Sequence, residues 1–440
     1  MLDNMLALMP KATAGAFFAC ALALASAPAQ AADTATPNDT ARFLAGMPLA
    51  PDSPLAALSK NAAWEQHASH FDRLFSREDT GTIGKIRAFS KAELPDKHDT
   101  MLYLFSGPDF LYANAFFPTA STYVLAGLEP VGPIPQLANL KRGAIDGSLR
   151  NLEISLNTLL NFSFFITQKM KSELSTGALY GTTSILYVFL ARTGKTVLEA
   201  TLVSLGEDGA VYTADDADYK KYTAARGVRI IFSDGDGPKQ TLYYFSTNLS
   251  DGSIERSGFV DFCDKLGSTD DSFIKSASYL LHTGGFTRAR RLILDHSSTV
   301  VEDDSGIPLA YFDPKQWRLR PFGRYVGPLS IFSGHYQAQM SQLFRRANAQ
   351  PIDFGLGYRW RNNESNLLVA ERMAPGTSEP EAKAEPSGEP PVRHFRGKSA
   401  RSHNRKEVAN TPARRPHHKR VDTQRGALTC PHYGVFPFCS

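Results

Sequence analysis

The chain has 440 residues, which allows one large domain or two of ordinary size. Hydrophobic residues make up 42% of it, with 28 Phe and 16 Tyr, so an aromatic-rich core is possible. The formal net charge of +4 is modest, and no segment after residue 31 is apolar over enough length to span a bilayer. Composition therefore argues against a protein embedded in the membrane by helices.

Residues 1–31 have the pattern of a secretory signal peptide. The apolar run Ala12–Ala25 is followed by Ala29-Gln30-Ala31, the small-x-small pattern that a signal peptidase requires. A lipoprotein signal is the alternative, but the segment Phe17–Cys20 matches it only in part because Phe17 is bulky. We predict a periplasmic or secreted protein, exported from a bacterium, whose mature chain starts at residue 32.

Three cysteines remain after such a cleavage. Export permits disulfides, and Cys430 and Cys439 flank the sequence CPHYGVFPFC, so we predict that these two are joined. Cys263 lies in an apolar stretch whose charged residues, Asp261, Asp264 and Lys265, hardly supply the basic neighbour that would lower its pKa. We interpret it as a buried, inert thiol.

The N-terminal part of the mature chain divides into a leader and the start of a globular body. Residues 32–53 are rich in Ala, Thr, Pro and Asp, which predicts a loose leader, and the body is expected over 54–372. Apolar residues at helical spacing predict a helix over Leu55–Arg77. His67 and His70 lie three residues apart on it, but no third ligand is evident, so no metal or other cofactor is predicted.

The stretch Asp99–Pro133 carries the strongest candidate site. Two apolar runs, Met101–Phe105 and Thr122–Ala126, predict buried strands, and each ends in a polar loop rich in Gly and Pro. Polar residues among aromatic ones are typical of a small-ligand pocket. The candidates are Ser106, Asp109, Asn114 and Glu129. The competing interpretation is structural: the first two cap the next turn and the amide satisfies buried backbone groups.

The remaining body alternates between helical and strand patterns. Helices are predicted over Ile145–Leu174, Ala178–Ala191, Gly258–Leu266, Asp271–His282, Phe286–His296 and Gln337–Arg345. Strands are predicted over Thr196–Leu205, Val228–Ser233, Thr241–Thr247, Gln316–Phe322, Leu356–Trp360 and Asn366–Ala370, with a hairpin over Thr299–Tyr311. This order predicts an α/β or α+β fold, with one mixed-sheet body and flanking helices.

Two further sets of residues could do hydrolytic chemistry. Asp303 and Asp304 are paired carboxylates suited to acid–base work, although Asp-Asp-Ser-Gly is also good turn sequence, which we favour. A triad of Ser106, His296 and an Asp is conceivable. The Gly-x-Ser-x-Gly elbow is lacking, and we expect His296 to end a helix instead.

Composition changes abruptly after Arg372. Residues 373–429 are rich in Pro and Glu and then in Arg and His, which predicts a disordered tail, and 430–440 forms a small Cys-closed tip. The segment Arg393–Arg425 is expected to bind anionic envelope polymers or lipids, without sequence-specific recognition of nucleic acid. A solubilising extension without a partner is the alternative.

The phrases LYLFSGPDFLYANAFFP, STYVLAGLEPVG and DDSGIPLAYF resemble those of a group of uncharacterised exported bacterial proteins. The resemblance covers about Pro54–Arg372 and implies export and a single body, without a named activity. On the sequence we favour a non-catalytic periplasmic or envelope-associated binding protein with a possible small ligand in the body. A hydrolase-like enzyme that uses Ser106, Asp109 or the Asp303/Asp304 pair is the alternative.

Overall fold

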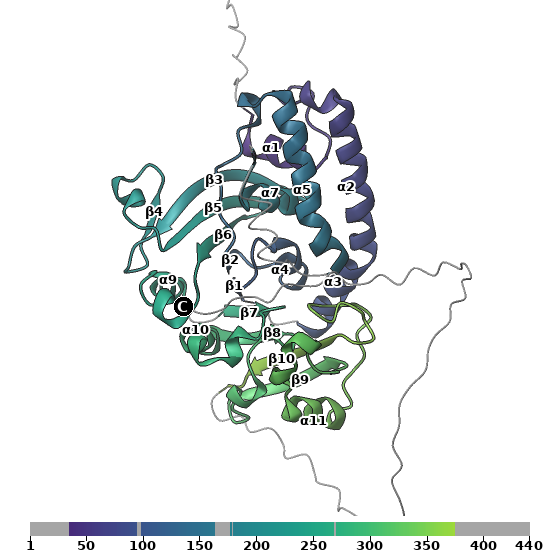
Figure 1. The fold of residues 1–440 in the computed structure, drawn as a ribbon, viewed down its shortest axis with the longest axis vertical. Helices are drawn as coiled ribbons and strands as arrows, with labels where there is room; N and C mark the ends of the chain where they lie inside the picture. The colour runs from purple at the N-terminus through teal and green to yellow at the C-terminus, as the bar shows by residue number, and fades with distance from the viewer. Residues whose placement is uncertain (1–34, 95–97, 163–176, 178, 268–269, 375–440) are drawn as a thin grey trace, which may run out of the picture. The chain divides into compact units, whose positions relative to one another are not determined.

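The structure is a computed structural model that describes residues 35–94, 98–162, 177, 179–267 and 270–374. The predicted signal peptide, the tail and the Cys430–Cys439 pair lie outside these ranges. The described chain confirms an α/β body with a mixed sheet and flanking helices (Figure 1).

Within the described residues, ten strands form one sheet in the order β4-β3-β5-β6-β2-β1-β7-β8-β10-β9. Five central strands, from β6 to β8 in this order, run parallel, and antiparallel strands flank them on both sides. The bounds are β1 Thr100–Leu104, β2 Thr122–Gly127, β3 Lys195–Leu205, β4 Val211–Thr213, β5 Ala225–Asp234, β6 Lys239–Thr247, β7 Asp270–Ile274, β8 Ser297–Glu302, β9 Trp317–Gly323 and β10 Asn366–Arg372.

Helices cover both faces of the sheet, and each face has its own hydrophobic core. Successive strand residues point to opposite faces, so Met101 and Tyr103 join one core while Leu102 and Leu104 join the other. The first core is covered by α1 Pro37–Leu44, α2 Ala62–Thr80, α3 Thr82–Glu93, α4 Phe110–Phe116, α5 Arg142–Phe162 and α7 Thr183–Arg192. The second is covered by α8 Asp251–Ile254, α9 Phe259–Leu266, α10 Thr287–His296 and α11 Ala338–Arg346.

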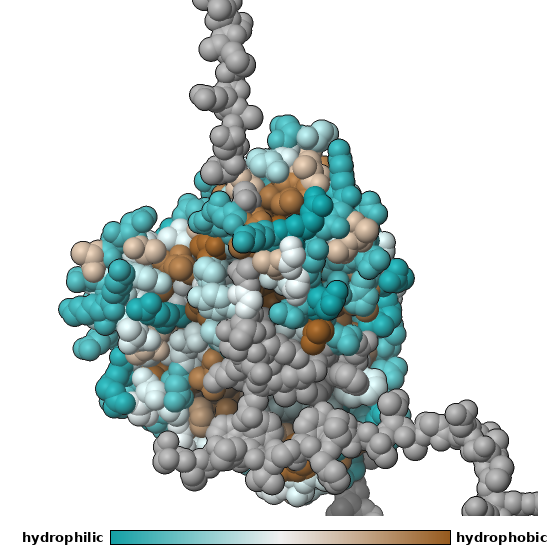
Figure 2. Space-filling view, turned by 45° about the horizontal axis from the view of Figure 1, so that its top comes forward, coloured by the Kyte–Doolittle hydropathy of each residue, from teal (hydrophilic) through white to brown (hydrophobic). Residues whose placement is uncertain are grey.

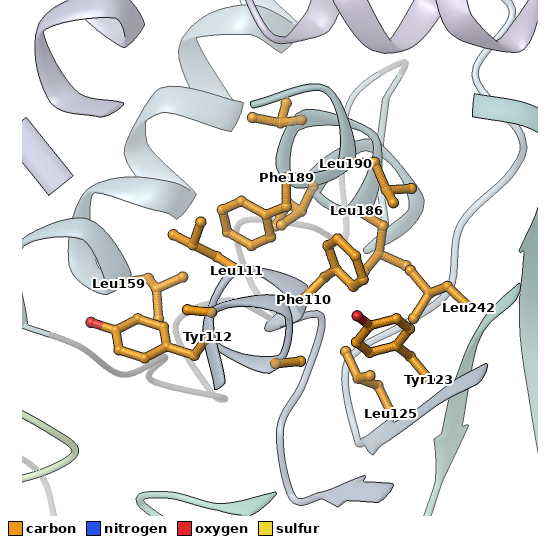
Figure 3. Packing of buried hydrophobic residues seen from close by; sticks show 14 of the residues in the cluster. Phe110, Leu111, Tyr112, Tyr123, Leu125, Leu159, Leu186, Phe189, Leu190 and Leu242 are labelled. Carbon is orange, nitrogen blue, oxygen red and sulfur yellow. The ribbon is translucent and has the colours of Figure 1, made fainter. Parts of the chain in front are cut away.

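Helix α4 fixes the loop that follows β1. All seven of its residues are buried. In Figure 3, Phe110 is directed toward Tyr123 of the sheet and toward α7, and Leu111 toward Phe189 of α7. Because α4 is packed on every side, the short loop between β1 and α4 has little freedom to move.

The predicted leader over 32–53 is wrong for α1. Thr36 caps this helix by accepting a hydrogen bond from the backbone N–H of Asp39, whose side chain bonds back to Thr36. Phe43 and Leu44 are fully buried in the first core. The body therefore begins before residue 54. The polar composition of the segment did not predict the short amphipathic helix that it forms.

The helix predicted over Asp271–His282 is wrong, because residues Asp270–Ile274 form β7, one of the five parallel strands. Its polar residues are satisfied by partners that are distant in sequence. Asp271 accepts a hydrogen bond from the backbone N–H of His98, and Ser272 bonds Ser297 of β8. These tertiary partners make a polar sequence compatible with a fully buried strand.

The hairpin predicted over Thr299–Tyr311 is also wrong. The turn after β8 is present, with the N–H of Gly306 donating to the carbonyl of Asp303. However, β8 pairs with β7 and β10, and the expected second arm ends in a 3₁₀ turn, Leu309–Tyr311. The last short strand prediction, Leu356–Trp360, is reduced to one isolated bridge between Leu356 and Arg359.

The other predicted elements agree with the structure apart from their ends. The predicted helix over Ile145–Leu174 corresponds to α5, and residues 163–176 lie outside the described chain. Figure 2 shows hydrophilic residues over most of the coloured surface in that view, with hydrophobic residues in separate patches. Among the described helices, none combines the length and the hydropathy needed to cross a membrane.

Candidate functional site at the carboxyl edge of the sheet

Parallel strands end at the same edge of a sheet, so the loops after β1, β7 and β8 meet there. Two contacts join them. The Lys275 ammonium lies 2.8 Å from Oδ2 of Asp109, and the backbone N–H of Ser276 donates to Oδ2 of Asp303 at 3.0 Å. We call Asp109, Lys275, Ser276, Asp303 and Asp304 the carboxyl-edge cluster.

Asp109 positions one side of the cluster. One of its carboxylate oxygens caps α4 by accepting the backbone N–H of Tyr112 at 3.3 Å, as the structural interpretation of the sequence predicted. The other accepts the hydroxyl of Tyr103 at 3.0 Å and pairs with Lys275. The side chains of Asp109 and Lys275 are 1% and 2% exposed, so this ion pair is shielded from solvent.

Lys275 provides a buried positive charge. Its ammonium lies 3.5 Å from the centre of the Tyr112 ring, a cation–π contact. Burial lowers the pKa of Lys275, and the neighbouring carboxylate of Asp109 opposes that effect. The ammonium therefore depends on Asp109, and not on water, for its charge partner.

Asp303 lies between Ser276 and Ser305. Its Oδ1 accepts both the backbone N–H of Ser305, at 3.0 Å, and the hydroxyl of the same residue. Burial and the neighbouring carboxylate of Asp304 raise the pKa of Asp303 to about 7. A carboxyl group with such a pKa can accept and return a proton near neutral pH.

Asp304 faces a different set of partners. It accepts the Tyr279 hydroxyl at 2.8 Å and the Asn366 amide at 3.1 Å. Burial raises the pKa of Asp304 as well. The two adjacent carboxylates therefore have different hydrogen-bond partners, and the turn favoured by the sequence is present alongside them.

Backbone strain is concentrated at this edge. Five non-glycine residues of the described chain have a positive φ, and four of them lie in the loops after β1 and β7. These four are Phe105 (62°), Ser276 (54°), Ser278 (52°) and Tyr279 (55°). Each such conformation costs about 1–3 kcal/mol and persists only where the surroundings impose it, which is typical of functional sites.

Buried polar atoms without a hydrogen-bond partner also occur at this edge. Among the described residues, Ser276 Oγ, Glu302 Oε1 and His282 Nε2 have none. Burial raises the pKa of Glu302 well above its usual range, whereas burial and the neighbouring His335 lower the pKa of His282 to about 4. Such atoms are rare in folded proteins, because each loses its hydration without compensation.

The other polar residues singled out in the central stretch have structural partners. The hydroxyl of Ser106 donates to the carbonyl of Gly107 at 2.8 Å, and the amide of Asn114 donates to the Tyr123 hydroxyl at 3.2 Å. Glu129 is buried, and its backbone carbonyl accepts the hydroxyl of Tyr244 at 2.8 Å. Only Asp109 of these candidates joins the carboxyl-edge cluster.

His296 lies at the opposite, amino edge of the parallel strands, as the last residue of α10 before β8. Its Nε2 is 2.8 Å from Asp264, and its Nδ1 is 2.9 Å from the carbonyl of Gly267. Ser106 follows the carboxyl end of β1, so the structure does not bring it together with His296 and no Ser106–His296 triad forms.

Sequence reasoning missed Lys275 and Ser276 because it placed both inside a helix. The available signal was weak: a single apolar pair, Phe273 and Ile274, followed directly by Lys275 and then by small residues. A strand of five residues with three polar ones carries no recognisable alternation. These two residues could therefore be recognised as part of the site only from the structure, which shows that β7 pairs with β1 and β8.

Cys263 is a buried free thiol on α9, as predicted. Burial, together with the carboxylates of Asp270 and Asp264, raises the pKa of the thiol well above its usual range. It therefore contributes packing rather than reactivity.

Comparison of the chain with protein-family models, with curated proteins and with solved structures finds no match in any of the three. In the described part of the chain, no group of three or more His, Cys, Asp or Glu side chains is arranged to hold a metal ion. The carboxyl-edge cluster is therefore the feature from which a function has to be inferred.

Proposed function

We propose that this chain is an exported, hydrolase-like enzyme that acts at the carboxyl edge, with Asp303 as the proton-transfer group. The observation that carries the proposal is the coincidence of backbone strain with buried ionisable groups at the ends of β1, β7 and β8. Ligand sites of α/β folds lie at this edge, and perturbed carboxyl groups there are suited to acid–base work.

The residues have distinct roles in such a reaction. Asp303 takes a proton from the attacking group and gives it to the leaving group, for which a pKa of about 7 is well matched. The Lys275 ammonium, which Asp109 holds in place and partly offsets, supplies a positive charge that stabilises developing negative charge at this edge. Its burial from water strengthens this electrostatic effect.

The test is hydrolysis by the mature protein of ester, phosphate-ester and peptide substrates. Asp303→Asn should reduce the rate by about 10²–10⁴-fold, because the amide cannot accept the proton. The matched control is Asp313→Asn, which changes an exposed Asp on the loop before β9. The wild-type rate should rise as the pH passes about 7 and Asp303 ionises.

Two results would count against this proposal. One is a folded wild-type protein that hydrolyses none of these substrate classes. The other is an Asp303→Asn variant that keeps the wild-type rate and its pH dependence, which would exclude Asp303 as the proton-transfer group.

A second candidate function, a binding protein of the cell envelope, is favoured by the composition of Arg393–Arg425. Lys and Arg on one segment gain affinity by displacing counterions from a polyanion, so such binding must weaken with salt. Full-length protein should bind anionic vesicles, lipopolysaccharide and an arbitrary duplex, and a truncation after Arg372 should not. Equal binding by the truncated protein, or binding that ignores salt, would refute a role for the tail.

Export and the Cys430–Cys439 disulfide are proposals that rest on the sequence alone. Mass spectrometry of the protein from its native cells should find an N-terminus at residue 32 and a peptide linked through the two cysteines. A retained segment 1–31, a lipid on Cys20, or two free C-terminal thiols would contradict them.

A further inference from the structure

We propose that Ser276 is the nucleophile of the carboxyl-edge cluster, and that the substrates are acyl compounds, that is, esters or amides. This inference rests on the proposed hydrolase function and specifies its chemistry. Ser276 follows Ile274 and Lys275 at the end of β7, the strand between β1 and β8.

The backbone of Ser276 is strained in a way that suits a nucleophile. Its φ of 54° lies in the left-handed region, directly after a parallel strand. A sharp turn of this kind lifts a serine side chain out of the strand's own plane and presents its hydroxyl at the edge of the sheet. The strain continues through Ser278 and Tyr279 to the 3₁₀ turn Leu280–His282, so the loop is held by its surroundings rather than by glycine.

The hydroxyl of Ser276 has no hydrogen-bond partner among the described residues, although the atom is buried. Neighbouring serines differ in this respect. The hydroxyl of Ser305 donates to Asp303, and that of Ser278 bonds the hydroxyl of Tyr358 at 2.9 Å. An unbonded hydroxyl beside a carboxylate is available to a substrate, whereas the bonded ones are committed to the fold.

Asp303 is the base for this nucleophile. It already accepts the backbone N–H of Ser276 at 3.0 Å, which fixes the carboxylate against that residue. Both groups also border Gly357: a methyl group at Gly357 would lie 1.9 Å from Asp303 Oδ2 and 3.2 Å from Ser276 Oγ. The two oxygens therefore border the same position beside Gly357.

The reaction balances without any further reagent. As the Ser276 Oγ–acyl bond forms, the hydroxyl proton passes to Asp303, and the same proton goes to the leaving oxygen or nitrogen as its bond to the acyl carbon breaks. Water then attacks the ester and gives a proton to Asp303. The Oγ–acyl bond breaks, the proton returns to Ser276, and an acid is released.

Access to the hydroxyl depends on the segment after β9. The residue Ser276 is partly exposed, but Gly357 lies against its hydroxyl, and the hydroxyl of Tyr358 donates to its backbone carbonyl at 3.0 Å. A substrate has to displace this contact. We therefore expect reagents that target unactivated serines to modify Ser276 slowly, and small, electrophilic reagents to modify it faster.

The test is covalent labelling of the mature full-length protein with a small alkyl fluorophosphonate, read by intact mass and peptide mapping. We expect one adduct per chain at Ser276, none in Ser276→Ala, and at least tenfold slower labelling in Asp303→Asn. Ser333→Ala is the matched control, because Ser333 is exposed and should not affect a site-selective reaction. Ser276→Cys provides a second, folded variant, whose thiol should be alkylated faster than that of buried Cys263.

Each outcome decides between the two proposals. Ester hydrolysis that survives in Ser276→Ala but is lost in Asp303→Asn would overturn the nucleophile and leave the hydrolase proposal intact, with water attacking directly. An adduct on another serine, or no adduct on an active wild-type protein, would also overturn the nucleophile. Absence of both labelling and hydrolysis in folded wild-type protein would overturn both proposals.

Discussion

The two edges of the parallel strands both carry buried ionisable groups, but they are built differently. At the amino edge, His296 lies 2.8 Å from Asp264, and His98 lies 2.9 Å from Asp271. In each pair one side chain reaches the surface: Asp264 is 56% exposed and His98 is 28% exposed. At the carboxyl edge, Lys275 and its carboxylate are both shielded from solvent.

The backbone conformations of the two edges also differ. Among the described residues, every non-glycine position with a positive φ in the strand-end loops lies at the carboxyl edge, as does the unbonded hydroxyl of Ser276. The amino-edge pairs connect helix ends and strand starts in ordinary conformations. An ion pair near a sheet is therefore compatible with a purely structural role, whereas strain beside an unsatisfied buried group points to function.

The largest effect should come from removing the buried cation. Lys275→Met leaves the carboxylate of Asp109 buried without its charge partner, and we expect a loss of about 3–5 kcal/mol in the free energy of unfolding. Urea denaturation measures it. The double variant with Asp109→Asn removes the uncompensated charge and should recover a large part of that loss.

The control for this prediction is another lysine with an exposed partner. Lys195 pairs with Asp234 at 2.8 Å, and Asp234 is 69% exposed. Because water can replace the lost partner, Lys195→Met should cost about 1 kcal/mol or less. Equal losses for Lys195→Met and Lys275→Met would remove the distinction between a pair with a buried carboxylate and a pair with an exposed one.

A smaller effect should come from the close approach at Gly357. Gly357→Ala introduces a Cβ 1.9 Å from Oδ2 of Asp303, at a φ of 60°, and should destabilise the protein by about 3 kcal/mol. Gly235 has a φ of 56° with nothing near its Cβ position, so Gly235→Ala should cost only about 1 kcal/mol. Thermal or urea unfolding that gives the same loss for both would mean that the carboxylate moves aside freely.

At the amino edge, we expect one residue to make the free energy of unfolding depend on pH. The carboxylate of Asp270, 3.5 Å from Nδ1, and the hydrogen bond to Asp264 raise the pKa of His296 to about 9, so its charged form stabilises the folded state. The contribution, on the order of 2–3 kcal/mol, is complete below about pH 6.5 and is lost as the pH rises through 9. His296→Gln should remove this part of the pH dependence of unfolding. An unchanged profile would contradict the assignment.

Much of the fold could be predicted from the sequence, because most strands carry a long or alternating apolar pattern. Thr196–Leu205 and Thr241–Thr247 were predicted close to their observed ends. In both cases the signal is local, so neighbouring residues determine the conformation.

The site could be predicted only in part. Asp109, Asp303 and Asp304 were among the candidates because polar residues at strand ends are visible in a sequence. Lys275 and Ser276 were not, because β7 is a strand through its pairing with β1 and β8 and not through its own pattern. Positive φ at a non-glycine residue likewise leaves no mark in the sequence, since only the surrounding packing imposes it.

The most direct test of Ser276 as the nucleophile of the strained carboxyl edge is Ser276→Gly, measured for both stability and hydrolysis. Glycine adopts a φ of 54° without strain and removes the unbonded hydroxyl, so unfolding should become harder by up to about 1 kcal/mol. Hydrolysis of an ester substrate should meanwhile fall at least 100-fold. A variant that loses stability and keeps its hydrolytic rate would show that the strained loop serves the fold and not a reaction.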